Sequence, residues 1–101
     1  MADTAPTSLA RTETVHASRY LQQLAKHWSH KFEVRFTPTA ATIDLPLGRC
    51  ELTADDQALE VTLKGTPHVD MGRFQTVVAE HLQRFGYRET LTFDWRDANP
   101  A

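Results

Sequence analysis

The sequence is poor in the residues that build cross-links and long apolar segments. It contains one cysteine, Cys50, which excludes an internal disulfide, and no Cys-x-x-Cys pair is present to hold a structural zinc. No apolar run approaches the roughly 20 residues that a membrane-spanning helix needs. Four glycines and five prolines in 101 residues leave no room for a repetitive or glycine-rich chain. Stability must therefore come from side-chain packing.

An excess of charge of one sign is also lacking. Eleven Lys and Arg residues stand against 13 Asp and Glu residues, which gives a formal net charge of −2. Without a long run of one sign, we expect neither nucleic acid nor a membrane as a partner, although a local basic patch is compatible with this balance. Residues 1–8 lack the charged and apolar regions of a secretory signal, so the expected location is the cytoplasm.

The length fits one domain with one hydrophobic core. Residues 1–8 are rich in Ala, Thr, Pro and Ser, and we predict a disordered tail there. Residues 9–96 should form the single α+β domain, and residues 97–101 a short polar tail.

Two segments have helical periodicity. In the first, Ser18 to Phe32, apolar residues recur at three- and four-residue steps, and the Ser18 hydroxyl can cap the N-terminus. The second runs from about Met71 to Phe85. Asp70 can cap its start, and Gly86 stands where a left-handed C-terminal cap is expected.

Period-two alternation predicts six strands, at residues 9–16, 32–37, 41–45, 49–53, 59–64 and 90–95. The four consecutive central strands should form an antiparallel meander with one apolar side. The order is thus β-α-β-β-β-β-α-β. We predict an α+β fold in which two helices pack on one face of a mainly antiparallel sheet of about six strands.

Three segments carry a family resemblance. They are His-Ala-Ser-Arg-Tyr-Leu from His16 with Lys-His-Trp-Ser-His-Lys-Phe up to Phe32, then His-Leu-Gln-Arg-Phe from His81 with Arg88-Glu89, and finally Phe93-Asp-Trp95. Over residues 9–96 the chain resembles the bacterial family called domain of unknown function 2218.

The resemblance implies either a stand-alone protein of this size or a domain beside siderophore-interacting flavoproteins. It therefore implies a link to iron or siderophore handling, with such a flavoprotein as a partner. One departure is visible, because relatives often carry Cys where this chain has Ala25. A function that needs a thiol at this position would not apply here.

Two histidines on the first predicted helix are the sharpest chemical feature. His27 and His30 are three residues apart, a spacing at which two imidazoles can share a metal ion. A stable site needs a third ligand, and His16 lies on the same side if the helix begins early, so the predicted metal ligands are His16, His27 and His30. The alternative, which we favour, is a solvated His30 and a His27 packed at the core boundary.

Tyr20, His27, His30 and Lys31 are predicted to line a ligand-binding cleft between the first helix and the sheet. The fold requires no cofactor, but a metal ion is compatible with the cleft. We expect a non-enzymatic accessory protein that binds a small molecule, a metal complex or a partner protein there. The alternatives are a small metal-dependent or acid/base enzyme that uses the same histidines, and a purely structural interaction module.

The remaining reactive side chains have structural interpretations. His81 falls within the apolar side of the second helix and should be a hydrogen-bonded core histidine, while Cys50 should be a small buried hydrophobe. Three arginines, Arg84, Arg88 and Arg96, could line an anion pocket with Lys31, but surface ion pairs are favoured for them. A solvated sheet face and two tryptophans lead us to expect a homodimer, formed through sheet edges or faces.

Overall fold

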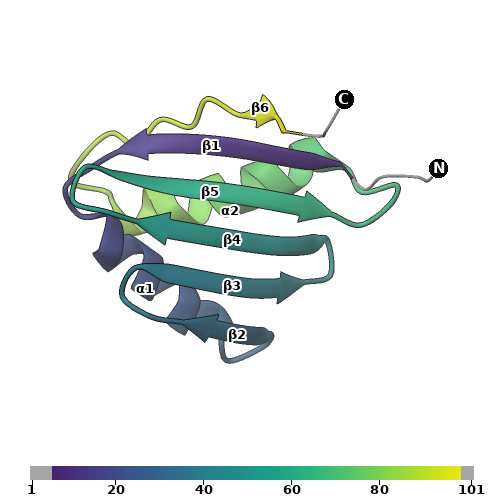
Figure 1. The fold of residues 1–101 in the computed structure, drawn as a ribbon, viewed down its shortest axis with the longest axis horizontal. Helices are drawn as coiled ribbons and strands as arrows, with labels where there is room; N and C mark the ends of the chain where they lie inside the picture. The colour runs from purple at the N-terminus through teal and green to yellow at the C-terminus, as the bar shows by residue number, and fades with distance from the viewer. Residues whose placement is uncertain (1–5, 99–101) are drawn as a thin grey trace.

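The computed structural model describes residues 6–98, which form one sheet with two helices on one side of it (Figure 1). The predicted fold class and element order are confirmed. The elements are β1 (Thr7–Glu13), α1 (Ala17–Trp28), β2 (Glu33–Phe36), β3 (Ala40–Leu45), β4 (Gly48–Ala54), β5 (Ala58–Gly65), α2 (Met71–Phe85) and β6 (Arg96–Asp97).

The sheet has the strand order β2-β3-β4-β5-β1-β6, and every neighbouring pair is antiparallel. The predicted meander is present as β2 to β5. The first strand, β1, returns beside β5, with Ala10 opposite Val61, and β6 lies outside β1. The sheet therefore ends in β2 on one side and in the two-residue β6 on the other.

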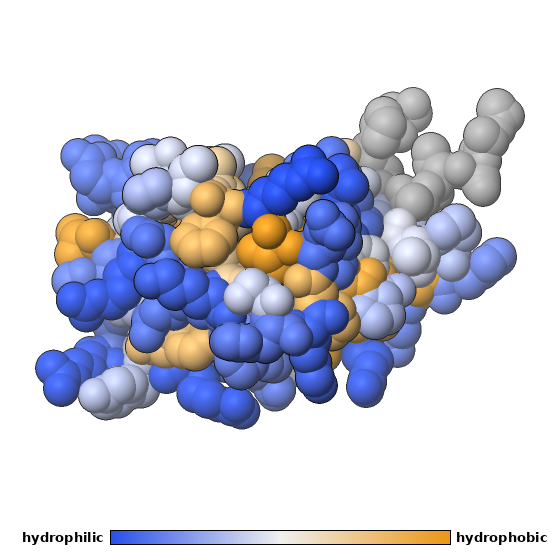
Figure 2. Space-filling model, turned by 90° about the horizontal axis from the view of Figure 1, so that it is seen from below, coloured by the Kyte–Doolittle hydropathy of each residue, from blue (hydrophilic) through white to orange (hydrophobic). Residues whose placement is uncertain are grey.

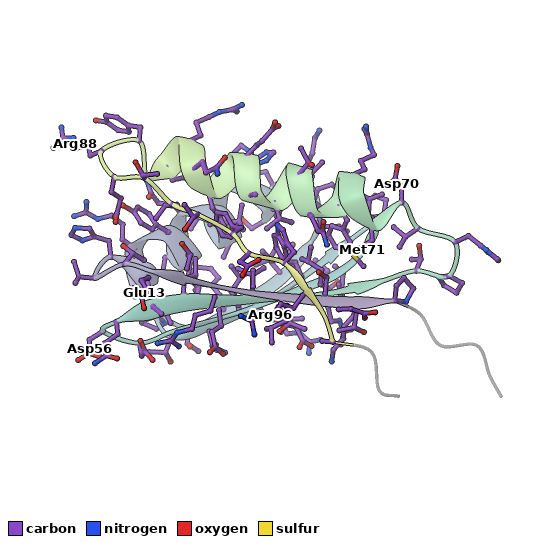
Figure 3. The ribbon with its side chains drawn as sticks, turned by 90° about the horizontal axis from the view of Figure 1, so that it is seen from above. Glu13, Asp56, Asp70, Met71, Arg88 and Arg96 are labelled. Carbon is purple, nitrogen blue, oxygen red and sulfur yellow. The ribbon has the colours of Figure 1, made fainter. Side chains whose placement is uncertain are left out.

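Alternation along the strands places one side of the sheet against the helices. Ile43, Leu52 and Val61 on this side are fully buried, as is Phe74 of α2. The opposite side carries charged side chains in exposed cross-strand pairs, such as Arg11 with Glu60 at 3.1 Å. Figure 3 shows these two sides from the β1 edge, with α2 above the sheet and polar side chains below. Exposed pairs of this kind contribute little to stability, so the core carries the fold.

The boundaries of α1 differ from the prediction at both ends. The helix begins at Ala17, its N-cap His16 makes no side-chain capping bond, and the predicted capping role of Ser18 is wrong. The Ser18 hydroxyl instead donates to the carbonyl of Pro38 at 2.6 Å. The helix ends at Trp28, four residues early, because the amides of Lys31 and Phe32 both bond the Trp28 carbonyl and turn the chain into β2.

The ends of α2 agree better with the sequence. The Asp70 carboxylate accepts the Arg73 amide at 3.2 Å, which confirms the predicted N-cap. Gly86 ends the helix as predicted, but its φ is −96°, so the expected left-handed conformation is wrong. Glycine is required there for space, since a Cβ would lie 2.7 Å from the Leu91 side chain and 3.0 Å from the Tyr20 ring.

The first and last strands are displaced from their predicted positions. The first strand begins at Thr7 and ends at Glu13, because the Thr14 hydroxyl accepts the His16 amide and turns the chain. Residues 90–95 form no strand; their alternation reflects packing of Leu91 and of the half-buried Phe93 and Trp95 on the core. Only Arg96 and Asp97 pair with β1.

The other structural predictions concern Cys50, the tails and the membrane. Cys50 is buried, and burial raises the pKa of its thiol. Parts of both predicted tails, residues 1–5 and 99–101, lie outside the described residues. Within residues 6–98, neither helix has the length and apolar character to cross a membrane. The cytoplasmic location stays a prediction.

Candidate functional site

A large hollow lies on the helix side of the sheet, where the end of α1, residues 73–81 of α2 and the β3–β4 turn meet. Its volume is about 730 Å³. The lining residues are His27, Trp28, His30, Lys31, Phe32, Leu45, Pro46, Leu47, Arg73, Val77 and His81. We call this hollow the histidine pocket. Its volume is in the range of small-molecule sites, which combine an apolar lining with a few polar groups.

The helical repeat explains how both helices supply the pocket. In α2, Arg73, Val77 and His81 follow one another at four-residue steps, so they share one side of the helix. In α1, His27 lies next to Trp28 in the last turn, and the chain then turns so that Lys31 also reaches the pocket. Each helix thus lines the pocket with the polar residues that border its apolar side.

Three rings meet at the centre of this arrangement. The ring centroids of His27 and His81 are 5.3 Å apart, and those of Trp28 and His81 are 4.9 Å apart. The Nδ1 of His81 lies 2.7 Å from the Val77 carbonyl oxygen. Because a carbonyl only accepts, Nδ1 carries a proton, and in the neutral ring Nε2 has the free lone pair. His81 is hydrogen-bonded as predicted, but it is only half-buried and lines the pocket.

The charges around the pocket have one sign. Lys31 and Arg73 line it together with three histidines, and no Asp or Glu does. Within the described residues, neither Lys31 nor Arg73 belongs to an ion pair. Their positive charges are therefore available to a ligand.

The three arginines predicted to form surface ion pairs behave differently from one another. Arg96 pairs with Asp94 at 3.9 Å, whereas Arg88 donates to the Tyr87 hydroxyl and lines a different hollow. Arg84 is exposed and lines neither of these two hollows.

The structure brings together three of the four predicted ligand-binding residues. His27, His30 and Lys31 line the histidine pocket, but Tyr20 lies more than a turn away along α1 and lines the second hollow. Sequence reasoning missed Arg73 and assigned His81 and Trp28 to other roles. The four-residue series in α2 was the available signal, because it places Arg73 and His81 on one side.

The predicted metal ligands are divided between the two hollows. His16 lies at the start of α1, 11 residues before His27, which corresponds to about 16 Å along a helix axis. His16 therefore cannot bind the same ion as His27 and His30, since metal–nitrogen bonds are about 2 Å long. Residues 6–98 contain no group of three His, Cys, Asp or Glu side chains arranged to hold a metal.

The second hollow lies beside a partly buried polar cluster. Its volume is about 590 Å³, and its lining residues are Val15, His16, Arg19, Tyr20, Gln23, Phe85, Tyr87, Arg88 and Glu89. The Tyr20 hydroxyl donates a short hydrogen bond to Glu89 Oε2, and the Thr14 hydroxyl donates to the same oxygen at 2.9 Å. This cluster ties the end of β1, α1 and the segment after α2 together.

Tyr20 and Glu89 shift each other's pKa in opposite directions. Burial first, and then the hydrogen bond to Glu89, raise the pKa of Tyr20 to about 12. The hydrogen bond from Tyr20 lowers the pKa of Glu89. The cluster is thus held as a neutral phenol and a charged carboxylate, which suits a structural role for Tyr20.

The contribution of this cluster to stability should depend on pH in the alkaline range. A raised pKa in the folded state means that the phenol contributes fully below its ordinary pKa of 10.0 and loses that contribution as the pH rises toward 12. We expect the free energy of unfolding to fall over this interval, and Tyr20→Phe to flatten the fall. Urea unfolding at a series of pH values measures it.

The matched control is Tyr87→Phe, since Tyr87 is 73% exposed. This variant should keep the alkaline fall of the wild type. Equal slopes for the wild type and Tyr20→Phe would contradict the role given to the cluster.

The chain is thus a small α+β protein with a hollow lined by aromatic and basic side chains. The chain belongs to the bacterial family called domain of unknown function 2218, described as an uncharacterized protein conserved in bacteria, which matches residues 9–96. Among solved structures it is similar to the NMR structure of PA4090 from Pseudomonas aeruginosa, with 38% identity and a TM-score of 0.74. The match covers 89% of this chain and 94% of that one. No curated protein matched.

Proposed function

We propose that this protein is a non-enzymatic binding protein whose histidine pocket takes a small organic anion with an aromatic or aliphatic body. The observation that supports this most is the composition of the lining. Trp28, Val77 and the β3–β4 turn offer apolar contact, while the charged side chains around them are all basic.

Each part of the pocket has a role in this proposal. Arg73 can hold a carboxylate through two parallel hydrogen bonds, and Lys31 adds a second positive charge. The rings of His27 and His81 lie beside the Trp28 indole, and the three rings together offer an aromatic surface to the ligand body. An apolar ligand without the anion would leave these charges unpaired, so specificity should come from the carboxylate.

The family resemblance suggests one class of ligand. Catechol carboxylates, the aromatic units of many siderophores, combine a flat ring with anionic oxygens and match this lining. The proposed link to iron or siderophore handling, with a siderophore-interacting flavoprotein as partner, rests on the resemblance. It makes 2,3-dihydroxybenzoate the first probe.

Tryptophan fluorescence tests the proposal directly. Trp28 lies in the pocket and Trp95 lines neither hollow, so a Trp95→Phe chain reports the pocket alone. We expect 2,3-dihydroxybenzoate and benzoate to change Trp28 emission in a saturable manner. The neutral isostere benzamide should bind much more weakly. Equal binding of benzoate and benzamide, or no saturable change, would refute an anion site.

A second candidate is an acid/base or metal-dependent enzyme that uses the first-helix histidines. The hydrogen bond between His81 Nδ1 and the Val77 carbonyl favours it, because it orients the His81 ring beside His27, as proton transfer by a side chain requires. Metal analysis of protein purified without an affinity tag tests the metal-dependent form. Stoichiometric metal that is lost in His27→Ala and His30→Ala would support it, and metal-free protein would argue against it.

A further inference from the structure

The strand β2 leaves one edge of the sheet open. It is the terminal strand of the sheet order, and β3 is its only strand neighbour among the described residues. Figure 2 views the molecule from below Figure 1, the side on which β2 lies. Apolar surface gathers in the middle of this view, with hydrophilic residues around it. An open strand edge presents unpaired N–H and C=O groups, with which another strand can pair.

The backbone geometry shows which residues face the open edge. At the β2–β3 turn the Thr37 amide donates to the Ala40 carbonyl at 2.8 Å. Antiparallel strands alternate, so Arg35 opposite Thr42 also bonds β3. The intervening residues, Val34 and Phe36, therefore direct their N–H and C=O groups away from β3, toward the open edge.

We infer that β2 pairs with β2 of a second copy, antiparallel, about a two-fold axis at Val34. The two Val34 residues then exchange N–H···O=C bonds across the axis. This register places Glu33 opposite the partner's Arg35 and, by symmetry, Arg35 opposite the partner's Glu33. Opposite charges at directly facing positions stabilise a strand pair.

Charge complementarity selects this register over its neighbours. A shift of two residues in one direction places Glu33 opposite the partner's Glu33, and a shift in the other direction places Arg35 opposite the partner's Arg35. Both shifts set like charges against each other. A shift of one residue would place Val34 opposite a partner residue whose N–H and C=O groups already bond its own β3, so the strands could not form a hydrogen-bonded ladder.

The side chains of β2 are available for this contact. Those of Glu33 and Arg35 are 67% and 85% exposed, and they approach each other only to 4.0 Å within one chain. Phe36, on the helix side, is 38% exposed, one of the three exposed large hydrophobic residues in the described chain. The register brings Phe36 to the partner's Phe32, a residue that lines the histidine pocket. Dimerisation thus covers Phe36 and places both pockets on one side of a continuous sheet.

Charge reversal tests the register. Sedimentation equilibrium of the full wild-type chain should show a monomer–dimer equilibrium. Either Arg35→Glu or Glu33→Arg should weaken it by about tenfold or more, because each creates two facing like-charge pairs. A mixture of the two variants should restore dimers as heterodimers, and the double variant Glu33→Arg/Arg35→Glu should restore homodimers.

Two controls keep the result interpretable. Circular dichroism melting of each variant separates lost pairing from lost folding. The double variant and the mixture add a second check, because in both of them opposite charges face each other again. Amide exchange adds a residue-level readout, since Val34 and Phe36 should gain protection with rising concentration while Arg35 is protected throughout. A wild-type monomer at all concentrations, or a dimer that the charge reversals leave unchanged, would overturn the inference.

Discussion

Replacing Gly48 with alanine should destabilise the fold by about 3 kcal/mol or more, because two penalties add. Gly48 has a φ of +145°, a region that side chains with a Cβ rarely adopt. A Cβ there would also lie 2.3 Å from the Lys64 carbonyl oxygen and 2.7 Å from the Gly65 Cα. Both are backbone atoms of the paired strand β5, so neither can move without breaking the ladder.

Gly72 provides the matched control. It lies in the first turn of α2, and the nearest atom to an added Cβ is an Asp70 oxygen at 3.5 Å, an ordinary contact. Gly72→Ala should therefore be neutral or stabilise by up to about 1 kcal/mol. Urea unfolding of both variants measures the difference. Equal stability of the two would contradict the close packing of β4 against β5.

Gly48→Ala should also change the shape of the histidine pocket. Gly48 follows the turn residues Pro46 and Leu47, which line the histidine pocket together with Leu45 at the end of β3. Displacing Gly48 from β5 should shift this turn and open the apolar side of the pocket.

The second large effect is expected from reversing the charge of Arg73. If Arg73 holds the ligand carboxylate, Arg73→Glu removes a charge-assisted hydrogen bond and adds repulsion. We expect a loss of about 1.5–3 kcal/mol, or roughly 10- to 100-fold in Kd, for 2,3-dihydroxybenzoate. Fluorescence titration in the Trp95→Phe background measures it.

Arg84→Glu makes the same change of net charge on the same helix, at an exposed position away from the pocket. It should leave the Kd within about twofold, because exposed charges are screened by salt over roughly 10 Å. Equal losses for the two variants would show that the field of the whole molecule, and not a contact in the pocket, attracts the anion.

Much of the fold could be predicted because local residue patterns indicate it. The alternation of apolar and polar residues in β2 to β5 indicates strands, and the helical repeat of α2 indicates a helix. Those elements are where predicted. The ends of α1 could not be read in this way, because Ser18 bonds Pro38 of a distant turn instead of its own helix. The final strand failed for a similar reason, since Leu91 and Trp95 alternate to pack on the core without a neighbouring strand.

The site was only partly predictable because it is assembled from two helices. His27, His30 and Lys31 are neighbours in sequence, and all three line the histidine pocket. Arg73 and His81 lie about 50 residues further on, and nothing local shows that α2 turns its polar margin toward α1. Tyr20 shares a helix with His27 but lines the second hollow, where its hydroxyl bonds Glu89. Only tertiary packing creates this contact, because the two residues are far apart in sequence.

Chemical-shift mapping by NMR is the most direct test of the central claim that the histidine pocket binds an organic anion. The full-length, isotope-labelled chain would be titrated with 2,3-dihydroxybenzoate while backbone amides and histidine ring signals are followed. We expect the largest changes at His27, Trp28, Arg73 and His81, with Glu89 unchanged. Shifts centred on the second hollow around Glu89, or no saturable shifts at all, would contradict it.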